Sequence, residues 1–268
     1  MLLLNLPEEF KRKYSSNLIM SQVVVQDILI NYVKKGSKGD PLILIHGVLG
    51  DSSAYTSLID ILKAHFTVYA IDLPMNGKSD IPARYLSIPD MSDILVDFMK
   101  RLKIKNPTIF AHSAGCLIAI DYASKYNVKE LILTEPAGLV YYKSKFRLFS
   151  KMVLISLSGL LRNPVIFLNS IRINIRNIVR NVSNDNFWKV VDLNYKKDYS
   201  EKIKKIRSPT TLILARYDRL FSYDFEKKFA KKLKNSRIIS IEGYHGWPHY
   251  RPWQISNYLD SKERFIKR

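Results

Sequence analysis

The sequence has very few of the residues that build disulfide scaffolds or metal centres. It contains one cysteine, Cys116, so no internal disulfide can form. We expect this thiol to lie in a buried helix as a small core residue. No Cys/His cluster has the spacing of metal ligands, and neither G-x-G-x-x-G nor a phosphate-binding loop occurs. We therefore expect no metal and no cofactor.

Long apolar runs are also absent. The opening MLLLNLPEEF is stopped by Pro7 and Glu8 and has no basic region before it, which is typical of neither a signal peptide nor a membrane span. The longest later run, 152–161 (MVLISLSGLL), is shorter than the roughly 20 residues that cross a bilayer. We expect a cytoplasmic protein that is not integral to a membrane.

Acidic residues are scarce beside basic ones. The chain has 24 Asp and Glu against 43 Lys and Arg, a formal net charge of +19. Nucleic acid, an acidic membrane surface and solubility alone are all compatible with such an excess. Because no nucleic-acid-binding motif or basic arm accompanies it, we expect no nucleic-acid partner. Hydrophobic residues make up 47% of the chain, which is enough for a folded core.

Short runs rich in Ile, Leu and Val alternate with stretches of helical length. Strands are expected at 23–33, 41–46, 66–73, 108–112, 130–134, 210–215 and 238–242. Helices are expected at 55–64, 90–102, 116–125 and 223–234. The turn residues KKGSKGD make 23–33 and 41–46 neighbouring strands in this prediction. Continuous apolar strands alternating with helices indicate an α/β fold with a mostly parallel central sheet flanked by helices.

The alternation breaks once along the chain. Between 137 and 207 the sequence has helical character and no convincing strand, and regular order resumes at SPTTLIL (208–214). We interpret this excursion as an inserted helical cap, or lid. The predicted domains are therefore a core of 1–136 and 208–268 and a cap of 137–207.

The strongest local signal is AHSAG at 111–115, which follows an apolar strand and opens an apolar helix. A serine on so sharp a turn has its hydroxyl above the sheet, and small residues two positions away on either side let strand and helix approach. A second loop, HGVLG at 46–50, ends an earlier strand and can turn a backbone N–H toward the serine. We predict Ser113 as the nucleophile and the N–H groups of Val48 and Ala114 as its oxyanion hole.

A base and an acid are expected at the carboxyl ends of later strands, where loops of a parallel sheet converge. TTLILARYD places Asp218 just after one strand, and IEGYHGWP places His245 after another. His245 would remove the proton of Ser113, and Asp218 would hold the imidazole in the correct tautomer. These three residues form the predicted catalytic triad.

Other residues compete for these roles or lie beside them. Glu135 also follows a strand end and is the alternative acid, while His249 is the alternative base. His112 is expected to point away from the nucleophile as a packed histidine, and His46 to be a structural turn residue.

Together these segments resemble the α/β-hydrolase superfamily over nearly all of the chain from residue 23 onward, outside the cap. The matching pieces are LILIHG, YAIDLPMNGKSD, AHSAGC, SPTTLILARYD and EGYHGWP. The family usually has D-x-x-G-x-G-x-S, and here Met75 stands at the first glycine while Asp72, Gly77 and Ser79 are kept. A serine at position 113 argues against the relatives with an aspartate nucleophile, namely haloalkane dehalogenases and epoxide hydrolases.

The resemblance implies a serine hydrolase, and we expect it to cleave a carboxylic ester with a hydrophobic acyl group. The same triad serves carbon–carbon bond hydrolases, aminopeptidases, lactonases and perhydrolases, so the fold does not decide the substrate. A binding protein that kept the fold without catalysis is the alternative of a different class.

The predicted cap has charge of one sign. Residues 141–180 include eight basic residues and no acidic one. Within one helical stretch, arginines share a face at 172, 176 and 180, and isoleucines share another at 171, 175 and 178. Either the apolar face packs on the core while the arginines stay in water, or the cap presents a basic and apolar surface to anionic lipid or to a lipophilic substrate.

Overall fold

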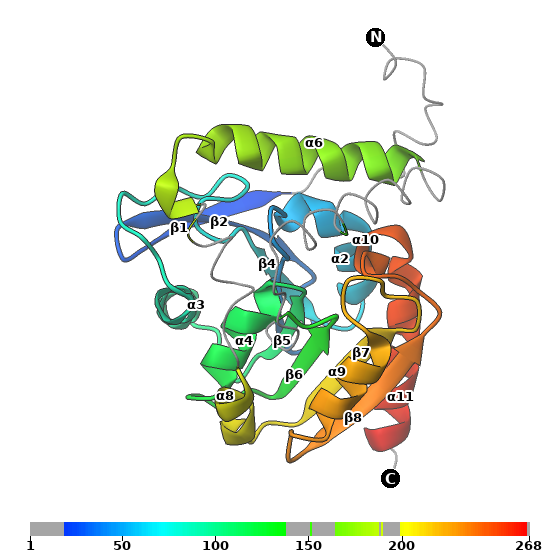
Figure 1. The fold of residues 1–268 in the computed structure, drawn as a ribbon. Coiled ribbons are helices and arrows are strands. Elements are labelled where there is room, and N and C mark those ends of the chain that lie inside the picture. The colour runs from blue at the N-terminus through cyan, green and yellow to red at the C-terminus, as the bar shows by residue number, and fades with distance from the viewer. Residues whose placement is uncertain (1–18, 138–150, 152–163, 188, 190–198, 267–268) are drawn as a thin grey trace.

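The computed structural model describes residues 19–137, 151, 164–187, 189 and 199–266 (Figure 1). Its centre is an eight-stranded sheet with the order β1-β2-β4-β3-β5-β6-β7-β8. The strands are β1 Met20–Val25, β2 Ile28–Lys35, β3 Pro41–Ile45, β4 Thr67–Ile71, β5 Thr108–His112, β6 Glu130–Thr134, β7 Thr210–Ala215 and β8 Ser236–Ile241. In this order, each strand from β4 through β3 to β8 is parallel to the next, and β2 is antiparallel to both β1 and β4. The predicted mostly parallel α/β sheet is confirmed.

The edge of the sheet differs from the prediction in two ways. The run 23–33 is a hairpin, because Gln26 and Asp27 both have positive φ (49° and 61°) and form a tight turn between β1 and β2. β2 and β3 are also not neighbours, since β4 lies between them. The loop joining them crosses the start of β4 so closely that a Cβ on Gly36 would lie 2.3 Å from the Phe66 carbonyl oxygen.

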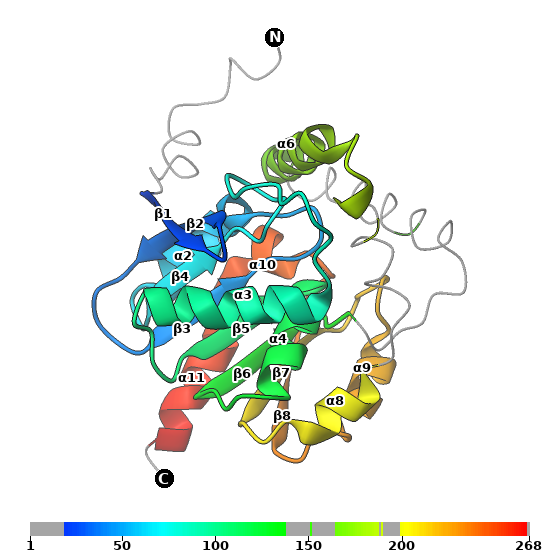
Figure 2. The ribbon, with the colours of Figure 1, turned by 90° about the vertical axis from the view of Figure 1, so that its left-hand side faces the viewer.

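Helices cover both faces of the sheet (Figures 1 and 2). They are η1 Ser52–Tyr55, α2 Thr56–Leu62, α3 Ile88–Arg101, α4 Gly115–Ala123, α6 Pro164–Asn181, α8 Ser200–Lys205, α9 Tyr223–Ala230, α10 Trp247–Tyr250, η2 Pro252–Ile255 and α11 Ser256–Ile266. None of the helices in these described ranges is both long and apolar enough to cross a membrane.

Side chains alternate between two cores, as the period of a strand requires. In β5, Ile109 and Ala111 pack in a cluster with α3, α4, α8 and α9, while Phe110 packs in the opposite cluster with α2, α10 and α11. Cys116 is fully buried in the first cluster, and burial raises the pKa of its thiol.

Parts of the predicted cap lie outside the described residues, namely 138–150, 152–163, 188 and 190–198. Within the described part, α6 runs along the top of the molecule in Figure 1, beyond the carboxyl ends of the parallel strands. α8 also falls in the predicted range, and its Ile203 is fully buried in the main core. The cap boundaries stay a prediction.

Candidate active site

Ser113 lies in the turn between β5 and α4 with φ +52°, a left-handed conformation that costs a non-glycine residue about 1–2 kcal/mol. Its N–H donates to the Thr134 carbonyl (3.0 Å), and its carbonyl accepts from the Cys116 N–H (3.0 Å). Gly115 has no room for a side chain, because a Cβ there would lie 2.5 Å from the His46 carbonyl oxygen. Ala111 belongs to β5 and lacks positive φ, so alanine fits where the family pattern has glycine.

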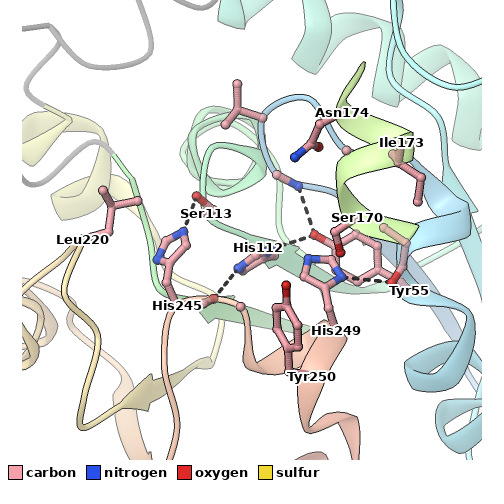
Figure 3. Close-up of a pocket in the computed structure, with 15 residues that line it drawn as sticks. Tyr55, His112, Ser113, Ser170, Ile173, Asn174, Leu220, His245, His249 and Tyr250 are labelled. Atoms are coloured by element: carbon pink, nitrogen blue, oxygen red, sulfur yellow. Dashed lines mark hydrogen bonds between the residues drawn. The ribbon is translucent and has the colours of Figure 1, made fainter. Parts of the chain in front are cut away.

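The three predicted triad residues lie together. His245 Nε2 is 3.0 Å from Ser113 Oγ, and His245 Nδ1 is 2.8 Å from Asp218 Oδ2 (the first contact is drawn in Figure 3). The other oxygen of this carboxylate, Asp218 Oδ1, accepts hydrogen bonds from the N–H groups of Leu220 (2.6 Å) and Phe221 (3.1 Å), which fix its orientation. With Nδ1–H donating to Asp218, Nε2 is left to accept the serine proton.

The alternative acid and base are bonded elsewhere. Glu135 is fully buried, accepts the Ala215 N–H at 2.8 Å and contacts the Thr134 hydroxyl. Burial, and then the charge of Asp218, raises the pKa of Glu135 well above its ordinary value. His249 donates from Nδ1 to the Ala54 carbonyl (2.9 Å), and burial lowers its pKa to about 4. The contact with Ser113 Oγ is made by His245, not by His249.

The loop at 46–50 passes directly beside the serine. A Cβ on Gly47 would lie 3.3 Å from Ser113 Cβ, so glycine allows the close approach. Within the described residues, the N–H groups of Val48 and Ala114 have no hydrogen-bond acceptor. Both can therefore donate to an oxygen above Ser113, and their role as an oxyanion hole stays a prediction.

A buried bridge that the sequence did not predict links the loop at 46–50 to the main chain of His245 (Figure 3). The Gly47 N–H donates to Tyr55 Oη (3.1 Å), and Tyr55 Oη lies 2.7 Å from His112 Nδ1. His112 Nε2 is 2.9 Å from the main-chain carbonyl oxygen of His245. Because a carbonyl only accepts, His112 is protonated at Nε2, and its Nδ1 accepts from the Tyr55 hydroxyl. Burial, chiefly, lowers the pKa of His112 well below its ordinary value, in keeping with a neutral ring.

The loop at 72–80 supports the other side of the loop at 46–50, which we call the oxyanion loop after its predicted role. His46 is buried, accepts the Leu73 N–H at Nε2 (3.0 Å) and donates from Nδ1 to the Gly47 carbonyl (2.7 Å). It is therefore a structural residue of this turn. Met75 takes the left-handed conformation of the glycine it replaces, with φ +71°, and is 1% exposed.

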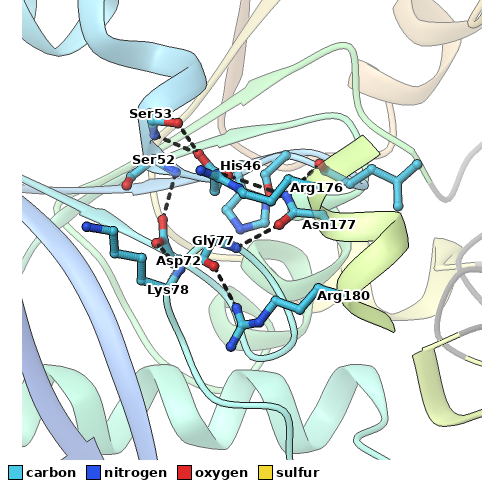
Figure 4. Close-up of polar contacts among 12 residues, drawn as sticks. His46, Ser52, Ser53, Asp72, Gly77, Lys78, Arg176, Asn177 and Arg180 are labelled. Carbon is cyan, nitrogen blue, oxygen red and sulfur yellow. Dashed lines mark hydrogen bonds and ion pairs between the residues drawn. The ribbon is translucent and has the colours of Figure 1, made fainter. Parts of the chain in front are cut away.

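Polar side chains of α6 attach it to both loops (Figure 4). Asn177 is fully buried, donates to the Leu49 carbonyl (2.9 Å) and accepts the Gly77 N–H (3.0 Å). Arg180 donates to the carbonyls of Gly77 and Ser79, both at 2.6 Å. The same helix thus spans the oxyanion loop and the loop at 72–80.

Arg176, one turn earlier, forms an ion pair with the buried carboxylate of Asp51. Arg176 and Arg180 are exposed, as the first interpretation expects, and each also binds the protein beneath the helix. The expectation that the isoleucine face packs on the core is wrong for Ile175, which is 54% exposed.

A cavity of about 150 Å³ opens above Ser113 and His245. Its walls come from the oxyanion loop, from Tyr250 and Leu220, and from Ser170, Ile173 and Asn174 of α6. Within the described parts of the chain, no group of three or more His, Cys, Asp or Glu side chains could hold a metal ion. The site therefore brings together a serine hydroxyl, a histidine and a small, partly open cavity.

The chain belongs to the α/β hydrolase fold family, whose model matches residues 40–176. The uncharacterized hydrolase YugF of Bacillus subtilis (strain 168) is 22% identical over 258 residues, covering 81% of this chain and 88% of that protein. The next curated relatives match over 31% and 38% of their own length, so those matches are partial.

Solved structures share the fold over almost the whole chain. A membrane phospholipase A superposes with a TM-score of 0.78 at 20% identity, covering 97% of this chain and 90% of that one. A putative lipase from Acinetobacter baumannii AYE gives a TM-score of 0.77 at 19% identity, covering 97% and 95%. At such identities the likeness shows the fold alone.

Proposed function

We propose that this protein is a serine hydrolase that cleaves a carboxylic ester with a hydrophobic acyl group. The observation that carries the proposal is the continuous line of contacts from Ser113 Oγ through His245 to Asp218, at 3.0 and 2.8 Å. A serine hydroxyl is a poor nucleophile unless a base removes its proton, and this arrangement supplies the base and its orienting carboxylate.

In the proposed reaction, His245 Nε2 takes the proton of Ser113 as Oγ attacks the ester carbonyl carbon. The oxyanion of the tetrahedral intermediate would accept the N–H groups of Val48 and Ala114. His245 then gives the proton to the departing alcohol, leaving an acyl-serine. Water, deprotonated by the same imidazole, attacks the acyl carbon, and the acid leaves as Ser113 regains its proton from His245.

The surroundings of Ser113 favour an apolar acyl group. Ile173 and Leu220 border the cavity, and a second cavity of about 40 Å³ lies across the oxyanion loop. The lining of the second cavity includes Leu73, Met75 and Met91.

Labelling with a fluorophosphonate probe tests the proposal. The probe reacts with an activated serine, so wild type should label at Ser113 and Ser113→Ala should not. Ser170→Ala is the matched control, because Ser170 borders the same cavity and should leave labelling intact. Peptide mass spectrometry identifies the labelled residue. Failure of the folded wild type to label would favour the binding-protein alternative, and labelling of Ser113→Ala would place the nucleophile elsewhere.

A further inference from the structure

The outward face of α6 is apolar. Leu168, Ile175 and Val179 are 46%, 54% and 66% exposed, and Val182, just after the helix, is 62% exposed. At about 100° per residue these four positions fall within a sector of about 60°, so they form one stripe along the helix. We call these four residues the α6 stripe.

The opposite face of the helix is the one attached to the protein. Asn177 and Asn181 are fully buried there, and their amides bond to the loops below (the Asn177 contacts are drawn in Figure 4). Phe167 and Ile173 are buried on that face as well, so the helix is attached by apolar and polar side chains together, and the α6 stripe takes no part in holding it. Single exposed apolar residues are ordinary, but a continuous apolar stripe indicates a surface that is covered in use.

The charge of the residues around the α6 stripe indicates what kind of surface covers the stripe. α6 contains Arg172, Arg176 and Arg180 and no acidic residue, and Asp51 beneath it is already paired with Arg176. Arg172 borders the α6 stripe and is exposed. An apolar stripe flanked by Arg172 matches an anionic lipid surface, where the apolar residues enter the acyl boundary and the guanidinium meets the headgroups. A second copy of the chain matches poorly, because both partners would have a formal charge of +19.

We propose that α6 docks the protein on an anionic lipid bilayer, with the α6 stripe at the interface. Ser170, Ile173 and Asn174 of the same helix border the catalytic cavity, so docking holds that cavity beside the lipid surface. The inference rests on exposure and charge and does not depend on the proposed function.

Vesicle flotation of the full-length protein tests the proposal. Wild type should float with vesicles containing phosphatidylglycerol and remain unbound with pure phosphatidylcholine. Ile175→Ser combined with Val179→Ser should weaken binding to the anionic vesicles by about tenfold or more, because two half-exposed side chains no longer enter the lipid. Arg172→Glu should also weaken it, and added salt should do the same.

Val24→Ser combined with Trp253→Ser is the matched control, since Val24 and Trp253 are 51% and 59% exposed on other elements. This variant should float as wild type does. Both double variants should hydrolyse a water-soluble ester at the wild-type rate, which separates docking from catalysis.

Equal flotation with neutral and anionic vesicles, no flotation at all, or wild-type binding by the stripe variant would each overturn the proposal. Light scattering that shows a dimer which the stripe variant dissociates would overturn it too, because the α6 stripe would then cover a second copy.

Discussion

Replacing Tyr55 by phenylalanine removes one oxygen from the bridge between the oxyanion loop and His245. That oxygen accepts from Gly47 and donates to His112, and Tyr55 is only 1% exposed. The phenyl ring fills nearly the same space, so no large cavity forms. Two buried polar groups, the Gly47 N–H and His112 Nδ1, are left without their partner.

The expected loss of stability follows from those two groups. Each buried polar group without a partner costs about 1–3 kcal/mol, which gives about 2–6 kcal/mol for the pair. At about 2–4 °C per kcal/mol for a domain of this size, Tm should fall by roughly 4–24 °C. Because the peptide before Val48 is no longer held and His112 can change tautomer, we also expect kcat to fall by about tenfold.

Measuring kcat for ester hydrolysis and Tm on the same samples separates a role of Tyr55 in positioning the site from a role in stability alone. Tyr258→Phe is the control, because the Tyr258 hydroxyl is buried and donates to Glu130 at 2.7 Å. Glu130 begins β6, at the end of the parallel sheet away from Ser113. This control should lower Tm and leave kcat unchanged at temperatures where it is folded. A Tyr55→Phe enzyme with wild-type kcat would refute the positioning role of the bridge.

Two further predictions concern the buried interior. Glu226 is fully buried, neither carboxyl oxygen has a partner within the described residues, and burial raises its pKa well above the ordinary value. The Glu226 carboxyl holds its proton more tightly in the folded state than in the unfolded state, so the folded state loses stability as pH rises above the ordinary carboxyl pKa. Glu226→Gln removes this ionisation and should therefore raise Tm relative to wild type at pH 8 but not at pH 5. Ile173→Ala should enlarge the cavity and shift the ester preference toward longer acyl chains, and an unchanged chain-length profile would contradict the position of that wall.

Local patterns in the sequence were sufficient to predict the sheet and the groups around Ser113. The serine turn depends on neighbours within two residues, and Asp218 and His245 each follow an apolar strand, so parallel strands bring their ends together. The hairpin at Gln26 and Asp27 was missed, because neither residue is the glycine that marks such turns most strongly.

Contacts between distant segments could not be predicted in the same way. Tyr55 meets His112 across 57 positions, and Arg180 meets Gly77 across 103. Periodicity identified α6 as amphipathic but could not say which face is attached to the protein. Asn177 and Asn181 face the core because the loops beneath them present carbonyl and N–H groups that these amides bind, a property of the assembled fold and not of the helix.

The proposed esterase activity is measured by the hydrolysis of p-nitrophenyl esters from acetate to palmitate, with wild type and Ser113→Ala side by side. We expect clear activity of wild type with an optimum at short acyl chains, because the cavity of about 150 Å³ is small. In Ser113→Ala turnover should fall by about 10⁴-fold or more. Wild-type activity no greater than that of the folded mutant on every ester would contradict the proposed esterase function.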